Sequence, residues 1–150
     1  MQGTFHWLRM RVFCYATEDE ELVGGALAEL AGVDEVERDE ADSEHGNRIL
    51  IFSCELLKQA DVVPVFQRLG RELCEGLAGS LGDRVDEDCV LHLRLDKQEL
   101  VQGRYVPARH GDVLSVTGKV ASHPARKEVA VRNMGGFLSS LAFPEGEGPS

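Results

Sequence analysis

The sequence lacks any apolar run of membrane-spanning length, and its first residues, Met1 to Thr4, show no basic stretch leading into an apolar core. A helix that crosses a bilayer needs about 20 mostly apolar residues, and a secretory signal needs both a basic and an apolar region. We therefore expect a cytoplasmic protein that has no membrane partner.

Closely spaced cysteines are also missing. The four cysteines stand at positions 14, 54, 74 and 89, and none forms a C-x-x-C pair. Structural zinc sites and thioredoxin-like dithiols are built from such pairs. Cys14 and Cys89 fall on the apolar phase of their segments, where free cysteine packs as a small apolar residue. We predict four reduced core cysteines, no metal and no cofactor.

Positive charge is scarce, because 16 lysines and arginines stand against 26 aspartates and glutamates, a formal net charge of −10. This excludes a general cationic coat, so an anionic partner must bind a local patch. The acid is concentrated in residues 34–44. We interpret that segment as a solvated edge strand or loop. It has no fixed ligand spacing that would indicate a carboxylate cation site.

Alternating and helical apolar patterns divide the rest of the chain. They predict strands over residues 5–15, 33–43, 48–57, 89–98 and 112–122, and helices over 17–32, 61–77 and 125–141. Thr17 and Asp61 are the expected helix caps. The order β-α-β-β-α-β-β-α predicts an α+β two-layer sandwich, a largely antiparallel sheet with helices on one face. We expect a single domain over residues 1–142 and a flexible acidic tail over 143–150.

Two of these strands carry polar faces that suit nucleic acid. In the first strand, the expected core face carries His6, Leu8, Met10, Val12 and Cys14. The expected open face carries Phe5, Trp7, Arg9, Arg11, Phe13 and Tyr15. The second is the segment CVLHLRLDKQ, which covers residues 89–98. Its polar face carries His92, Arg94 and Asp96, which alternate with core leucines. Guanidinium groups can meet phosphates while rings stack on bases. Open sheet faces also carry such pairs merely to pack on one another.

Two further groups of polar residues could take part. His45, Asn47 and Arg48 surround a Gly46 turn and could bind phosphate or ribose, although such a segment is often only a turn. His92 and Asp96 share a strand face, so an enzyme such as a nuclease or phosphatase is one hypothesis for this face. A usable site also needs a nucleophile or a metal with its ligands. No such motif is present, so we expect no catalysis.

Three segments carry a family resemblance: HWLRMRVFCYATED, HGNRI, and LHLRLDKQ with Gly103 following. Over residues 5–141 the chain resembles an archaeal family described as predicted exosome subunits or RNA-binding domain proteins. The resemblance implies the fold of the large-subunit ribosomal protein that binds five-S RNA. It also implies RNA binding in RNA processing or ribosome-linked metabolism. The positions it implies are Arg9, Arg11, His45, Asn47, Arg48, His92, Arg94, Lys97 and Gln98.

Residue patterns and resemblance together predict a non-catalytic RNA-binding protein whose partner is structured RNA, with exosome or ribosomal components as further partners. Structured RNA is favoured because few aromatic residues are available for stacking. The predicted RNA-binding residues are Trp7, Arg9, Arg11, Phe13, His45, Asn47, Arg48, His92, Arg94, Lys97, Gln98 and Lys119. The alternative is a homo-oligomeric scaffold, such as a homodimer, or a protein-interaction scaffold that buries the same sheet face.

Overall fold

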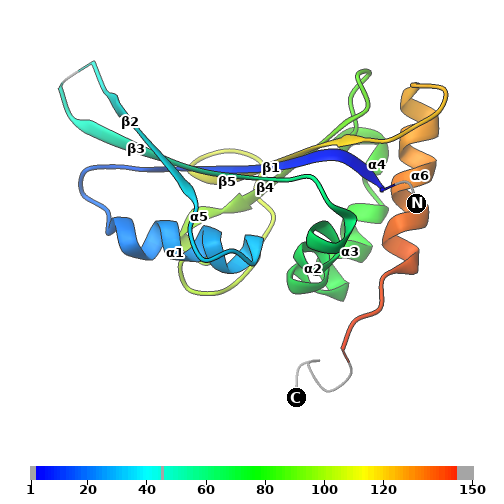
Figure 1. Ribbon diagram of the computed structural model, residues 1–150, viewed down its shortest axis with the longest axis horizontal. Helices are drawn as coiled ribbons and strands as arrows, with labels where there is room; N and C mark the ends of the chain where they lie inside the picture. The colour runs from blue at the N-terminus through cyan, green and yellow to red at the C-terminus, as the bar shows by residue number, and fades with distance from the viewer. Residues whose placement is uncertain (1–2, 45, 145–150) are drawn as a thin grey trace.

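The computed structural model describes residues 3–44 and 46–144, which form five strands and six helices in two layers (Figure 1). The strands are β1 (Phe5–Cys14), β2 (Glu37–Asp42), β3 (Arg48–Leu56), β4 (Val90–Asp96) and β5 (Val113–Val120). The helices are α1 (Glu20–Ala31), α2 (Gln59–Leu69), α3 (Arg71–Ala78), α4 (Leu81–Arg84), α5 (Lys97–Leu100) and α6 (Lys127–Ser140). In Figure 1 α1, α2 and α3 lie on one side of the sheet, and α6 runs past one end of it, for most of its length on that same side.

The strands form one sheet in the order β2-β3-β1-β5-β4, and every neighbouring pair is antiparallel. This confirms the predicted α+β two-layer architecture. The acidic segment supplies the edge strand β2, whose six residues are all exposed. Charged side chains on an edge strand disfavour pairing with a further strand.

One local feature differs from the predicted alternation of the first strand. The register of β1 against β5 shifts between Phe5 and Trp7, because Phe5 pairs with Val120 and Trp7 with Lys119. The extra residue, His6, is exposed, whereas Phe5 is buried. A bulge reverses the phase of a strand. The placement of His6 on the core face and Phe5 on the open face was therefore wrong.

The bulge lets Phe5 join the two helices α2 and α6 in the core. Its ring centroid lies 5.8 Å from that of Phe66 and 6.1 Å from that of Phe137, and those two rings are 5.3 Å apart. Space for Phe5 comes from Gly118 in β5. A Cβ atom there would lie 2.6 Å from Cε1 of Phe5 and 2.9 Å from Cδ1 of Leu8.

We therefore expect Gly118→Ala to lower the free energy of unfolding by about 1–3 kcal/mol, the usual cost of overpacking a core. Urea denaturation would measure it. The matched control is Gly136→Ala on the exposed side of α6, where a Cβ atom meets nothing within 4 Å. It should stabilise the protein by about 0.5–1 kcal/mol through helix propensity. Equal stability of Gly118→Ala and wild type would contradict this account of the core.

Helix boundaries depart from prediction in two places. The first helix begins at Glu20, and its cap is Asp19, whose carboxylate accepts from the backbone N–H groups of Glu21 and Leu22. Thr17 is not the cap. The second predicted helix is two helices, because Gly70 with φ of 96° separates α2 from α3, and α2 begins after Lys58 rather than Asp61.

The remaining fold predictions have mixed outcomes. All four cysteines are free; Cys14, Cys74 and Cys89 are buried, and Cys54 is partly buried. Phe143, assigned to the tail, packs against the core, while residues 145–150 lie outside the described part of the chain. No helix in residues 3–44 and 46–144 is long and apolar enough to cross a membrane.

Candidate nucleic-acid interface

Seven of the predicted residues lie on β1, β4 and β5 in the phase that the strand register assigns to the sheet face opposite the core. Cross-strand partners share a face, so the register defines its rows. Trp7, Lys119 and Val90 form one row, and Arg9, Thr117 and His92 form the next. The third row is Arg11, Ser115 and Arg94. We call the seven residues Trp7, Arg9, Arg11, Phe13, His92, Arg94 and Lys119 the open-face cluster.

Arg11 and Arg94 form the centre of this cluster. Both pair with Ser115, one from each side, so their Cα atoms are two strand spacings, or about 10 Å, apart. The Arg11 guanidinium lies 5.5 Å from the centroid of the Phe13 ring, and Arg94 Nη1 donates to the Arg109 carbonyl at 3.0 Å. Neither arginine has an ion pair within the described residues, and both are exposed. Both charges are therefore available to an anionic ligand.

Arg9 is held more tightly. It pairs in register with Glu55 of β3 and forms an ion pair with that carboxylate, while its guanidinium lies 4.0 Å from the centroid of the Trp7 ring. One face of the indole is therefore covered by Arg9. A base approaching this point meets the guanidinium plane, which stacks on bases as aromatic rings do.

His92 has a different partner from the one the sequence suggested. Its Nε2 lies 2.8 Å from Oδ2 of Asp86, whereas Asp96 accepts a hydrogen bond from the Glu99 backbone and caps α5. Burial alone would raise the pKa of Asp86. Hydrogen bonds from His92 and from the backbone of Val90 outweigh it and hold that pKa below its ordinary value. Asp86 therefore stays ionised beside His92 at neutral pH.

The open face is basic on one side and acidic on the other. Glu37 and Asp39 of β2 pair with Ser53 and Ile51 of β3, which share the face of Arg11 and Phe13. With Glu55 they form an acidic border along the β2–β3 side. Like charges repel, so this border would confine an anionic ligand on this face to β1, β5 and β4.

Lys97 does not belong to this face, and its predicted role as a phosphate contact needs correction. Its side chain is fully buried. The ammonium donates to the Phe13 carbonyl at 2.9 Å and forms ion pairs with Glu18 at 2.5 Å and Asp112 at 2.6 Å. An ammonium has three N–H donors, and here all three are engaged inside the protein.

The other predicted residues also lie away from the cluster. Arg48 is on the helix side of β3 and forms ion pairs with Glu20 and Glu40, both at 3.4 Å. Asn47 closes the β2–β3 turn through its backbone, and Gln98 is exposed on α5 beyond the end of β4. His45 lies outside the described residues.

Sequence reasoning missed two acidic residues that shape the face. Glu55 faces Arg9 only because β1 and β3 pair in this register, and Asp86 reaches His92 from the segment before β4. The alternation of β3 places Glu55 on the outer phase, but nothing local indicates its partner. Within the described residues no group of three or more His, Cys, Asp or Glu could hold a metal ion.

The fold and this surface define a class: a one-sided α+β sheet protein whose bare face carries a basic and aromatic cluster. A protein-family model described as RNA binding matches residues 7–120. Since that match spans more than half of the chain, the chain belongs to this family.

Known relatives agree with that assignment. The chain is 30% identical over 145 residues to RNA-binding protein PAB1135 of Pyrococcus abyssi, covering 85% of this chain and 89% of the relative. The structure of Mth689, a DUF54 protein from Methanothermobacter thermautotrophicus, is 34% identical with a TM-score of 0.75, covering 89% and 98% of the two chains. Protein AF2318 from Archaeglobus fulgidus is 28% identical with a TM-score of 0.74, covering 92% and 99%.

Proposed function

We propose that this protein binds RNA through the open-face cluster, as a non-catalytic module. The observation that carries the proposal is the row Arg11–Ser115–Arg94 on a protein of net charge −10. This row presents two exposed guanidinium groups that have no carboxylate partner among the described residues. Guanidinium groups bind phosphate oxygens in a bidentate manner. Membership of a family described as RNA binding supports the same function.

The proposal extends to the kind of RNA and its setting. Only two aromatic side chains, Trp7 and Phe13, belong to the cluster, and Arg9 covers one face of the indole. Single-stranded RNA is usually bound by stacking successive bases on rings, so few rings favour a structured RNA bound through its backbone. The sequence resemblance supports a cytoplasmic role in RNA processing, with the exosome or ribosome-linked metabolism as its setting.

Trp7 provides the direct test, because it is the single tryptophan of the chain and lies in the cluster. We expect structured RNA to change its fluorescence saturably. If Arg9, Arg11, Arg94 and Lys119 all neutralise phosphates, log K should fall with log salt with a slope of about −3 to −4. Filter binding on the same samples gives an independent affinity. RNA binding that leaves Trp7 fluorescence unchanged would place the interface elsewhere.

A homodimer is the second candidate, and the two-sided charge of the open face favours it. A two-fold axis brings the same patch of two copies together, so the acidic border of one could meet the basic cluster of the other. A stable dimer in mass measurements that also blocks RNA binding would replace the RNA proposal. A monomer that binds RNA would exclude the homodimer as the function of this face.

A further inference from the structure

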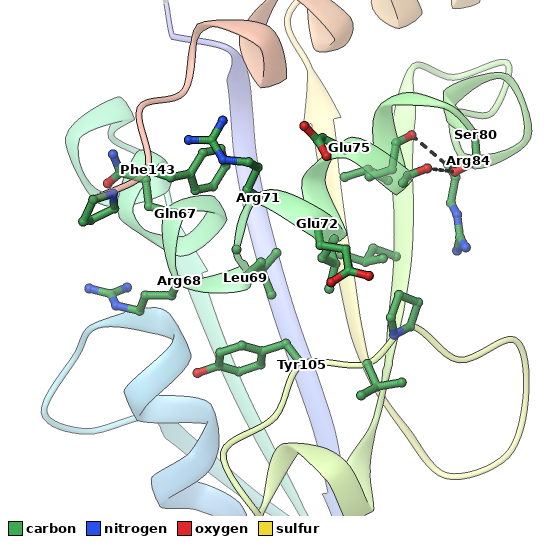
Figure 2. A pocket seen from close by; sticks show the side chains of 18 residues that line it. Gln67, Arg68, Leu69, Arg71, Glu72, Glu75, Ser80, Arg84, Tyr105 and Phe143 are labelled. Atoms are coloured by element: carbon green, nitrogen blue, oxygen red, sulfur yellow. Dashed lines mark hydrogen bonds between the residues drawn. The ribbon is translucent and has the colours of Figure 1, made fainter. Parts of the chain in front are cut away.

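The structure contains a cavity of about 1080 Å³ on the helix side of the sheet (Figure 2). It opens to the surface and is lined by α2, α3, α4 and the segments 105–107 and 143–144, and Leu93 of β4 reaches it from the core face. Cavities that bind small molecules have volumes of about 300–1,000 Å³, so this one has ample space for such a ligand. The sheet separates it from the open-face cluster.

The cavity combines an apolar floor with aromatic walls. Four leucines form the floor: Leu69, Leu73, Leu77 and Leu93. Tyr105 and Phe143 add rings on the side where Figure 2 shows Arg68 and Arg71. Burial, together with the nearby Glu29 carboxylate, raises the pKa of Tyr105. Its hydroxyl therefore remains a hydrogen-bond donor at neutral pH.

Three arginines line the same cavity, Arg68 and Arg71 on one side and Arg84 on the other (Figure 2). Arg68 Nη1 donates to the Leu30 carbonyl at 2.9 Å, and the Arg71 guanidinium lies 5.0 Å from the centroid of the Phe143 ring. None of the three forms an ion pair within residues 3–44 and 46–144. Carboxylates outnumber basic residues in this chain, so three arginines that line one cavity without an ion pair among the described residues indicate an anionic ligand.

The two glutamates of the cavity restrict where that charge can lie. Glu72 and Glu75 both belong to α3, and neither forms an ion pair among the described residues. A ligand charged along its whole length would meet them unfavourably. A ligand with one anionic end and a flat, uncharged body can place the anion at the arginines and the body on the leucines and Tyr105.

We propose that this cavity binds a mononucleotide, with its phosphate at Arg68 and Arg71 and its base against Tyr105 and the leucine floor. The guanidinium plane offers phosphate a bidentate site, and a base buries its flat faces against rings and apolar side chains. The site is distinct from the proposed RNA surface and does not depend on it.

Calorimetric titration with AMP tests the proposal, with adenosine and inorganic phosphate as separate probes. We expect saturable AMP binding and at least tenfold weaker binding of either fragment. Arg71→Gln should weaken AMP binding at least tenfold. Arg132→Gln is the matched control, because it makes the same charge change on the exposed side of α6, outside the cavity. It should stay within twofold of wild type.

Further variants separate this site from the open face. If Arg71→Gln does not fold, Arg68→Gln removes the other guanidinium group assigned to the phosphate and should also weaken AMP binding. The Arg11→Ala/Arg94→Ala variant should keep wild-type affinity for AMP. The proposal is overturned if AMP does not bind at millimolar concentration, if Arg132→Gln weakens binding as much as Arg71→Gln, or if only the Arg11→Ala/Arg94→Ala variant loses it.

Discussion

Replacing Lys97 with alanine is expected to lower the free energy of unfolding by about 3 kcal/mol, near the lower end of the cost of breaking a buried ion pair. The ammonium joins Phe13 at the end of β1 to Glu18 before α1 and Asp112 before β5. Without it both carboxylates and a carbonyl lose their partner. The lower end applies because the Glu18 and Asp112 side chains are 21% and 35% exposed, so water can replace part of the interaction.

Thermal unfolding measures this effect, and the melting temperature should fall by about 6–12 °C for a chain of this size. Lys58→Ala is the matched control, because Lys58 is exposed and its side chain makes no capping bond to α2. It should change stability by less than about 0.5 kcal/mol. Combining Lys97→Met with Glu18→Gln and Asp112→Asn removes the charges together and should recover part of the loss. A Lys97→Ala protein as stable as Lys58→Ala would contradict this role.

The difference in the free energy of unfolding between wild type and Lys97→Ala should also depend on pH, which gives a second measurement. Burial alone would raise the pKa of Glu18, but its hydrogen bond and ion pair with Lys97 outweigh that effect. Burial alone would lower the pKa of Lys97, but its hydrogen bonds and ion pairs with Asp112 and Glu18 outweigh that effect. The folded-state pKa of Glu18 is therefore lowered, and its contribution is lost as pH falls through that value. The folded-state pKa of Lys97 is raised, and its contribution is lost as pH rises through it. The stability difference between wild type and Lys97→Ala should be largest between about pH 4.3 and 10.4, the ordinary values of the two groups.

Lys97 also shows where sequence reasoning stops. In LDKQ it lies near the end of the predicted strand over residues 89–98 and looks like an ordinary surface lysine. Its partners Phe13, Glu18 and Asp112 are distant in the chain, so only the assembled sheet brings them together. By contrast, Arg11 and Arg94 were placed correctly on the open face because alternation along a strand is a local property.

Two other differences have the same physical origin. The apolar residues of the predicted second helix keep a helical spacing past Gly70: they are Val62, Phe66, Leu69, Leu73 and Leu77. Periodicity therefore did not reveal that the helix breaks there between α2 and α3. The bulge at His6 depends on the space that Gly118 leaves on the neighbouring strand. Both are set by packing between segments, which one stretch of sequence does not encode.

Removing both central arginines of the open face, Arg11→Ala/Arg94→Ala, is expected to weaken RNA binding about 10- to 100-fold at low salt. It should also make the log–log salt slope shallower by about 1–2 units, since each lost phosphate contact removes somewhat less than one. Neither guanidinium takes part in an ion pair among the described residues. Protein stability should therefore change little, and affinity and stability can be measured separately.

The control must reproduce the loss of two positive charges elsewhere on an acidic protein. Arg126→Ala/Arg132→Ala does so at exposed positions, one at the start of α6 and one within it. If the long-range charge of the protein governed binding, both double variants would weaken it equally and flatten the slope alike. If the open face contacts phosphates, only Arg11→Ala/Arg94→Ala changes the slope, because counterion release counts the phosphates that are neutralised directly. The comparison therefore decides whether this face is the RNA interface.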